Sequence, residues 1–266
     1  MTTEDQNIQN DLEEKVQLRV AVVQPELLFD ESKSPRENDE ANVKHALELL
    51  ERIDTNSVDL VIFPEVYPNI AGEVPMKDSG LLEAAKKIGT YVLAGETYQG
   101  RNASTLINPD GEVEKRMYKV QLSVEEIGHV KPGKQPGLFD IKVKDKTVKL
   151  GVLTCWDFAF PQQVEYLIKK GAKAIINPSM NVVSLIDARK SDARLWSVYF
   201  NIPTVSANLA GKTKLPWGMT YGGGNSEIIS GTNTNIMELD RPAKDSDYVI
   251  QKLGTKEGIL KHTLEL

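Results

Sequence analysis

The sequence predicts an α/β fold in which a buried sheet is covered by helices. Short runs of β-branched and other apolar residues recur along the chain, at 18–24, 58–63, 149–155, 172–178 and 203–208. Segments with the spacing of amphipathic helices separate several of them. Continuous apolar strands that alternate with such helices are typical of a sheet buried on both faces. With 266 residues, the chain suits one large domain of this class.

The first predicted unit is a β-α-β unit. The strands 18–24 and 58–63 each end at a break that contains proline, and a helix is expected between them over 37–53. Within that helix the apolar positions recur every three or four residues and share one face: Val43, Ala46, Leu47, Leu50 and Ile53. In such units the carboxyl ends of the strands carry the functional loops.

The same pattern recurs in the second half of the chain. The strand 149–155 precedes a helix that begins near Pro161 and stops at Gly171, and the strand 172–178 follows. A further helix is expected over 187–200, before the strand 203–208. N-P-D-G at 108–111 and V-K-D-K-T-V at 143–148 predict hairpin turns, which add strands of mixed direction.

Composition limits the classes of partner. The formal net charge of -6 opposes general attraction to nucleic acid or to anionic lipid, because both are negatively charged. Charged residues interrupt every apolar segment before it reaches the roughly 20 residues needed to span a bilayer. A single cysteine excludes an internal disulfide. We therefore expect a cytoplasmic protein with a small-molecule partner, no nucleic acid and no membrane.

Residues 1–16 are expected to be a loose N-terminal leader, and 17–266 one domain. The opening M-T-T-E-D-Q-N-I-Q-N-D-L-E-E-K lacks the basic start and apolar run of a secretory signal. No repeat, low-complexity tract or Ser/Pro-rich linker marks a further boundary.

Cys155 stands at the end of a very apolar strand, and a helix is expected to begin soon after it, near Pro161. In such a strand-to-helix turn, a thiol can project into a cleft while backbone N–H groups face a developing oxyanion. A free cysteine is more often a small buried hydrophobe, so this position alone also fits a core residue.

Glu65 and Lys119 are the residues that favour a catalytic interpretation. Glu65 follows a buried-type strand in V-I-F-P-E, which predicts the same edge of the sheet as Cys155. A carboxylate there can take the thiol proton and return it to a leaving amine. Lys119, at an apparent strand end in R-M-Y-K-V-Q-L, can stabilise a tetrahedral intermediate and favour the thiolate. Taken singly, each also fits a solvated surface residue.

In this order, F-P-E at 63–65, Lys119 and C-W-D-x-x-F-P at 155–161 resemble the Glu-Lys-Cys signature of the nitrilase-like carbon–nitrogen hydrolase family. The resemblance extends from about Val20 to about Ser230 and includes I-I-N-P-S, S-A-N and G-G-N-S. Glu126, seven residues before Gly133, is similar to a second glutamate of that family.

The resemblance implies a four-layer α-β-β-α sandwich that forms a homo-oligomer, a dimer or higher. It also implies an amidase without cofactor, in which the Cys155 thiolate attacks an amide carbonyl and Glu65 protonates the departing amine. Water activated by Glu65 would then release the acid from a thioester. Lys119 and the backbone N–H of Trp156 would hold the oxyanion. Asp157, directly after Cys-Trp, favours the amide-hydrolysing branch over the nitrile-hydrolysing one.

Two positions depart from the family's pattern. Asn181 stands where many members have an aromatic residue, and L-W-S-V-Y-F-N at 195–201 replaces a charged run, with Trp196 and Tyr199 in place of the charges. An unusual pocket wall or subunit contact is expected there.

Other interpretations remain open. A nitrilase or an N-carbamoyl hydrolase would use the same three residues, and a non-catalytic binding or scaffold protein would keep the fold. The scattered His45, His129 and His262 predict no metal site. G-G-G at 222–224 lacks the spacing of a phosphate loop and is expected to be a turn.

Overall fold

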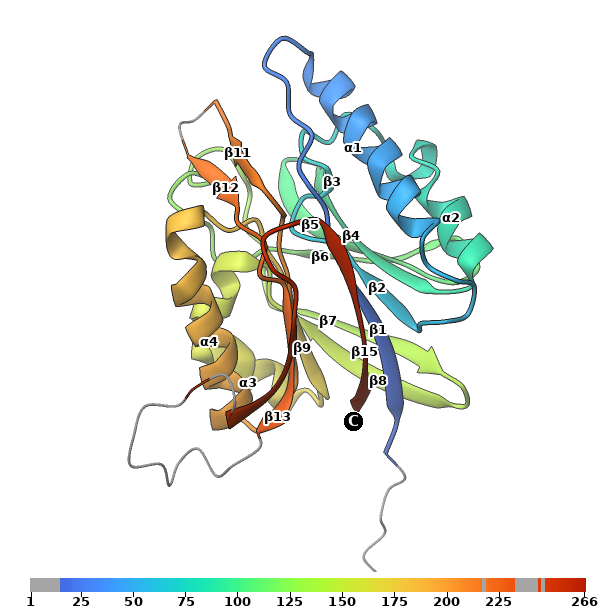
Figure 1. Ribbon diagram of the computed structural model, residues 1–266, viewed down its shortest axis with the longest axis vertical. Helices are drawn as coiled ribbons and strands as arrows, with labels where there is room; N and C mark the ends of the chain where they lie inside the picture. Colours follow the sequence, from blue (N-terminus) through green and yellow to red (C-terminus); the bar gives the residue numbers. More distant parts are fainter. Residues whose placement is uncertain (1–14, 217–218, 233–243, 245–246) are drawn as a thin grey trace, which may run out of the picture.

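The computed structural model describes residues 15–216, 219–232, 244 and 247–266. Two mixed sheets pack face to face, and helices cover both outer faces (Figure 1). This arrangement confirms the predicted α-β-β-α sandwich. Of the predicted leader 1–16, residues 1–14 lie outside the described residues, while Val16 exchanges backbone hydrogen bonds of 2.8 and 2.9 Å with Leu266.

The first sheet has the order β15-β1-β2-β4-β5-β6, and β3 pairs with β4. Strands β1, β2 and β4 run parallel, and the other pairs on this path are antiparallel. Its strands are β1 (Gln17–Gln24), β2 (Leu60–Ile62), β3 (Pro68–Asn69), β4 (Tyr91–Tyr98), β5 (Arg101–Ile107), β6 (Val113–Tyr118) and β15 (Gly258–Glu265).

The second sheet has the order β14-β13-β10-β9-β8-β7, with β8, β9 and β10 parallel. Its strands are β7 (Gly137–Val143), β8 (Lys146–Val152), β9 (Ala174–Pro178), β10 (Thr204–Ala207), β13 (Glu227–Thr232) and β14 (Tyr248–Lys252). The short strands β11 (Lys212–Lys214) and β12 (Thr220–Gly222) form a separate hairpin.

Helices α1 (Pro35–Leu50) and α2 (Leu81–Ile88) lie over the first sheet, and α3 (Pro161–Lys169) and α4 (Ile186–Tyr199) over the second (Figure 1). The described residues also form three 3-10 turns: η1 (Met76–Asp78), η2 (Cys155–Ala159) and η3 (Val183–Leu185). In the described part of the chain, none of these helices has the length and apolar character that crossing a membrane requires.

Three apolar clusters correspond to the three spaces between the four layers. The central cluster joins the facing sides of the two sheets, for example Val20 and Ile62 with Leu150 and Ile176. A second cluster packs α1 and α2 on the first sheet. A third packs α3 and α4 on the second sheet. Burial on both faces explains why the strand sequences are continuously apolar.

The predicted elements are present, with shifted ends. The helix predicted over 37–53 begins at Pro35, because Ser34 and Glu37 form a capping box in which Ser34 N donates to Glu37 Oε2 at 2.8 Å. It ends at Leu50, although Ile53 remains buried in the same cluster. The strand predicted over 149–155 ends at Val152. Both predicted hairpins, β5–β6 and β7–β8, are formed.

Candidate active site

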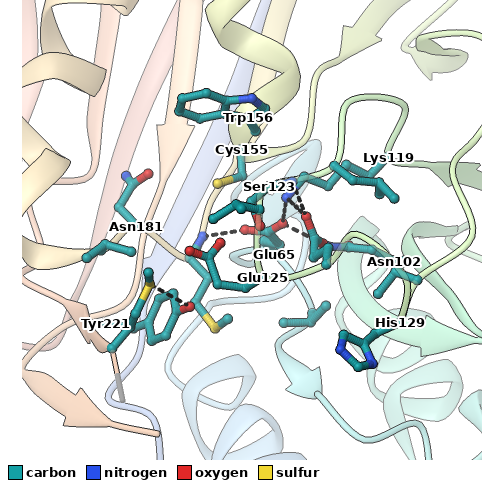
Figure 2. A pocket seen from close by; sticks show the side chains of 18 of the residues that line it. Glu65, Asn102, Lys119, Ser123, Glu125, His129, Cys155, Trp156, Asn181 and Tyr221 are labelled. Atoms are coloured by element: carbon teal, nitrogen blue, oxygen red, sulfur yellow. Dashed lines mark hydrogen bonds and ion pairs between the residues drawn. The ribbon is translucent and has the colours of Figure 1, made fainter. Parts of the chain in front are cut away.

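Three loops meet at one end of the sandwich and carry the three predicted side chains. Glu65 follows β2 and Lys119 follows β6, and these strands run in the same direction, because two antiparallel steps link β4 to β6. Cys155 follows β8, in the other sheet. The prediction of one shared sheet edge is therefore wrong for Cys155. The three side chains line one pocket, as Figure 2 shows.

A buried charged cluster consists of Glu65, Asn102, Lys119 and Glu126. Lys119 Nζ lies 2.7 Å from Glu65 Oε1 and 2.7 Å from Glu126 Oε2. Asn102 Nδ2 donates to both carboxylates, at 2.8 and 2.9 Å. Only 2% of the Lys119 surface is exposed, and a charge so withdrawn from water is tolerated when opposite charges and hydrogen bonds satisfy it.

The cluster shifts the pKa values of its members in opposite directions. Burial lowers the pKa of the Lys119 ammonium, but Glu65, Cys155 and Glu126 outweigh it, so this pKa lies above its usual range. Burial raises the pKa of the Glu126 carboxyl, but Lys119 outweighs it, so this pKa lies below its usual range. Both groups are therefore ionised at neutral pH.

The Cys155 thiol is affected differently. Burial raises the pKa of this thiol, Glu65 raises it further, and the opposing effect of Lys119 is too small to cancel them. Lys119 thus favours the thiolate, as expected from the sequence, but the net direction is upward. The resting sulfur carries its proton at neutral pH.

The backbone is held in unusual conformations beside both the sulfur and the carboxylate. Cys155 has a φ of 50° and Val66, next to Glu65, a φ of 49°, in the left-handed region that non-glycine residues rarely adopt. At Gly95 on β4, an added Cβ would lie 2.3 Å from the backbone nitrogen of Val66, so only glycine allows this loop so close. Such conformations persist where the surrounding structure imposes them, and they cluster at functional sites.

Asp157 joins the loops from the two sheets. Its carboxylate accepts hydrogen bonds from the backbone N–H groups of Val120 at 3.0 Å, Gln121 at 2.6 Å and Thr154 at 3.2 Å. Burial raises the pKa of Asp157 to about 6, against the effect of these hydrogen bonds. The sequence relates Asp157 only to the choice between the amide-hydrolysing and the nitrile-hydrolysing branch. The structure shows that it also holds the segment after Lys119.

The pocket above the charged cluster has a volume of about 920 Å³ and a mostly apolar lining. One side is formed by the loop between Lys119 and β7. We call five lining residues of this loop the pocket wall: Leu122, Val124, Glu125, Ile127 and Val130. Trp156, from the Cys155 turn, also lines the pocket. A mostly apolar cavity of this size with a few convergent polar groups is typical of small-molecule sites.

A model of the carbon-nitrogen hydrolase family matches residues 19–230, most of the chain. The chain belongs to the carbon-nitrogen hydrolase family. It is 25% identical to a nitrilase from Pyrococcus abyssi over 65% of this chain and 70% of that one. It is also 25% identical to an (R)-stereoselective amidase from Pseudomonas sp., over 72% of this chain and 78% of that one.

A solved structure shares the fold. A Saccharomyces cerevisiae protein described as a member of branch 10 of the nitrilase superfamily superposes with a TM-score of 0.70. It is 22% identical, over 94% of this chain and 90% of that one. Membership in the carbon-nitrogen hydrolase family supports hydrolysis of non-peptide carbon–nitrogen bonds as the general reaction.

Of the two departures from the family pattern, one lies at the pocket. Asn181 lines it, and its backbone N–H donates to Asn208 Oδ1 at 3.0 Å. Trp196 instead packs against the turn that carries Cys155, where its Nε1 donates to the Phe158 carbonyl at 2.7 Å. Tyr199 is 69% exposed. Neither side chain lines the pocket. The prediction that residues 195–201 form an unusual part of the pocket is therefore wrong. The prediction of a subunit contact there stays a prediction.

Sequence reasoning missed Asn102, which bridges both carboxylates of the charged cluster from β5. The available signal was a polar residue inside a strand, in R-N-A-S-T-L-I, whose side chain needs a partner when buried. Among the described residues, no group of three or more His, Cys, Asp or Glu side chains is arranged to hold a metal ion.

Proposed function

We propose that this carbon-nitrogen hydrolase is an amidase that cleaves a small linear amide through a thioester on Cys155. The observation that carries the proposal is the pairing of Lys119 with two carboxylates, 2.7 Å from each, directly beside the thiol. A nucleophile, a base and a fixed cation around one pocket are the groups that acyl transfer needs.

In the acylation step, the sulfur attacks the amide carbon while Glu65 takes the thiol proton. The raised pKa of Cys155 means that a base must remove the thiol proton, and Glu65 is a carboxylate hydrogen-bonded to this thiol. The carbonyl oxygen becomes an oxyanion. Lys119 has three N–H donors and gives two to carboxylates, which leaves one for this oxygen, together with the backbone N–H of Trp156.

Collapse of the intermediate breaks the C–N bond, and Glu65 gives its proton to the departing ammonia or amine. In the second half, Glu65 takes a proton from water, and the water oxygen attacks the thioester carbon. The C–S bond then breaks, the sulfur regains its proton and the carboxylic acid leaves. Glu126 acts as a positioning residue in both halves, because its carboxylate also contacts the Lys119 ammonium, at 2.7 Å.

The test is ammonia release from a panel of primary amides by the wild type and Cys155→Ala, with intact-protein mass spectrometry after rapid acid quenching. We expect turnover and an acyl adduct with the wild type, and neither with the variant. Circular dichroism shows whether the variant is folded. Equal turnover by both proteins would refute the assigned nucleophile. Binding of amides without turnover by the wild type would favour the scaffold alternative.

A nitrilase is the second candidate, since a relative of that description matches most of the domain. The same thiol would attack a nitrile carbon, and the product would again be an acid and ammonia. Parallel assays with matched pairs, such as butanamide and butyronitrile, separate the two activities. N-carbamoyl amines belong in the same panel, because they would yield carbon dioxide in addition to ammonia and the amine.

A further inference from the structure

Glu125 is the charged residue of the pocket that the proposed reaction does not use. Its side chain lines the cavity and points into it, on the side away from the Lys119 ammonium (Figure 2). Within the described residues, its carboxylate has no hydrogen-bond or ion-pair partner, and the residue is only half-exposed. A carboxylate that is partly withdrawn from water and unpaired is stabilised when a cation binds beside it.

The loop fixes the backbone that carries the Glu125 side chain. Glu126 N donates to Ser123 O at 3.0 Å and Val130 N donates to Glu126 O at 2.9 Å, so the turn is closed by its own backbone. The Glu126 side chain is in turn fixed by Lys119 and by Ser123 N, at 2.9 Å. Consecutive glutamates therefore face different surroundings, one paired within the charged cluster and one open to the cavity.

The charges around the cavity determine what Glu125 can select. Lys119 is the one lysine or arginine among the described lining residues, and two carboxylates, of Glu65 and Glu126, already pair with it. Glu125 then adds a negative charge that no neighbour balances. The field in the cavity consequently favours a positive group on the ligand and opposes a negative one.

The rest of the pocket wall is apolar. Val124 and Ile127, on either side of Glu125, line the same cavity and are among the most exposed large hydrophobic residues of the described chain. Contact of such side chains with an alkyl or aryl body buries apolar surface and so favours binding, but it supplies no hydrogen bond.

From these observations we infer that the substrate is an amide whose apolar body ends in a cationic nitrogen, an ω-amino amide, with Glu125 as the residue that recognises that nitrogen. The reaction part of this inference rests on the proposed amidase function. The recognition part concerns binding alone and is tested separately.

The test measures binding to Cys155→Ala, which cannot turn substrate over. The probes are butanamide, hexanamide and octanamide, each compared with its ω-amino and its ω-carboxylate analogue by calorimetric titration. We expect the ω-amino form of at least one chain length to bind about 10- to 100-fold more tightly than the uncharged form, the usual range for a hydrogen bond to a charged group. The ω-carboxylate form should bind most weakly.

Glu125→Gln on the same background keeps the shape of the side chain and should abolish the preference for the ω-amino form. Glu114→Gln, an exposed glutamate on β6 outside the lining, removes one negative charge elsewhere and should leave the preference intact. A preference that survives Glu125→Gln, equal binding of the three forms, or no binding of any ω-amino form overturns the inference.

The two proposals fail in different ways. A charge preference that depends on Glu125, with no turnover by the wild type, would support cation recognition and refute the amidase. Turnover of primary amides without a charge preference would support the amidase and refute cation recognition.

Discussion

Glu126 and Glu125 are neighbours in the sequence, but they belong to two regions of the site, one with a paired carboxylate and one with an unpaired carboxylate. Glu126 is part of the charged cluster, where it contacts the Lys119 ammonium at 2.7 Å and accepts from Asn102 at 2.9 Å. Glu125 is part of the pocket wall, where its carboxylate has no partner among the described residues.

Under the two proposals, the charged cluster serves the chemical step and the pocket wall serves substrate selection. Charges that are already paired and oriented need little rearrangement when an oxyanion develops, which favours the rate of the chemical step. An unpaired charge and exposed apolar side chains find partners only on the bound substrate. Such groups favour discrimination between substrates. Substitutions in the charged cluster should therefore lower kcat and stability, whereas those in the pocket wall should mainly change KM.

The strongest test of this division is Lys119→Met, which keeps the length of the side chain and removes its charge. Two buried carboxylates then lose their cation, so the free energy of unfolding should fall by about 3–5 kcal/mol. With one oxyanion donor gone, kcat should fall by about 10²–10³-fold. Urea denaturation and steady-state kinetics measure the two effects.

Lys115→Met is the matched control, because Lys115 is exposed on β6 four residues earlier. It should change the free energy of unfolding by no more than about 0.5 kcal/mol. If Lys119→Met resembles this control in both stability and kcat, the Lys119 ammonium contributes neither to the stability of the fold nor to the chemical step, and the division is contradicted.

A second test concerns the carboxylate that joins the two halves of the site. The pKa of Asp157 is raised from 3.8 to about 6 in the folded protein, mainly by burial. A carboxyl with a raised pKa binds its proton more tightly when folded, so its contribution to stability is greatest at low pH. That contribution is lost as the pH rises through the window between these two values, and it amounts to about 3 kcal/mol.

Asp157→Asn removes this titration. The stability of the wild type minus that of the variant should fall by about 3 kcal/mol between about pH 4 and pH 7 and stay level above that range. Asp145→Asn, at an exposed position of the β7–β8 turn, controls for the loss of one carboxylate. A level difference across the whole window would contradict the assignment. Urea denaturation at each pH supplies the values.

Local patterns predicted the elements that depend on local physics. Helices α1, α3 and α4 and strands β1, β8, β9 and β10 follow from apolar spacing and from proline or glycine at their ends. Helix α2 was missed because it has only eight residues, and glycines at positive φ flank it instead of a side-chain cap. Strand β15 was missed because its partner β1 lies at the other end of the chain.

Local patterns in the sequence predicted only those residues of the candidate site that lie at strand ends. Glu65 and Cys155 each follow an apolar strand, and Lys119 follows the mixed strand β6, so all three strand ends are visible in the sequence. The sheet that each strand joins depends on long-range pairing, which that pattern does not contain, so Cys155 was placed on the wrong sheet edge. Asn102 could be noticed only as a polar residue inside strand β5. Glu125 lies in a loop, where no local pattern distinguishes it from ordinary polar residues.

The smallest expected effect belongs to the pocket wall. Val124 lines the pocket and is 75% exposed, so Val124→Ala should change the free energy of unfolding by no more than about 0.5 kcal/mol. It removes apolar surface that a longer acyl chain would cover, at about 0.8 kcal/mol per buried methylene. For hexanamide, KM should rise by about three- to tenfold while kcat changes by less than about twofold. For acetamide, whose acyl chain is too short to need this contact, KM should stay near its wild-type value.

Val249→Ala is the matched control, because Val249 is a partly exposed valine on β14 that does not line the pocket. It should leave the KM of both amides unchanged. The division between the two regions predicts that Val124→Ala acts on KM and Lys119→Met on kcat. A fall in kcat at constant KM in Val124→Ala would contradict it, because the pocket wall would then contribute to the chemical step and not to substrate selection.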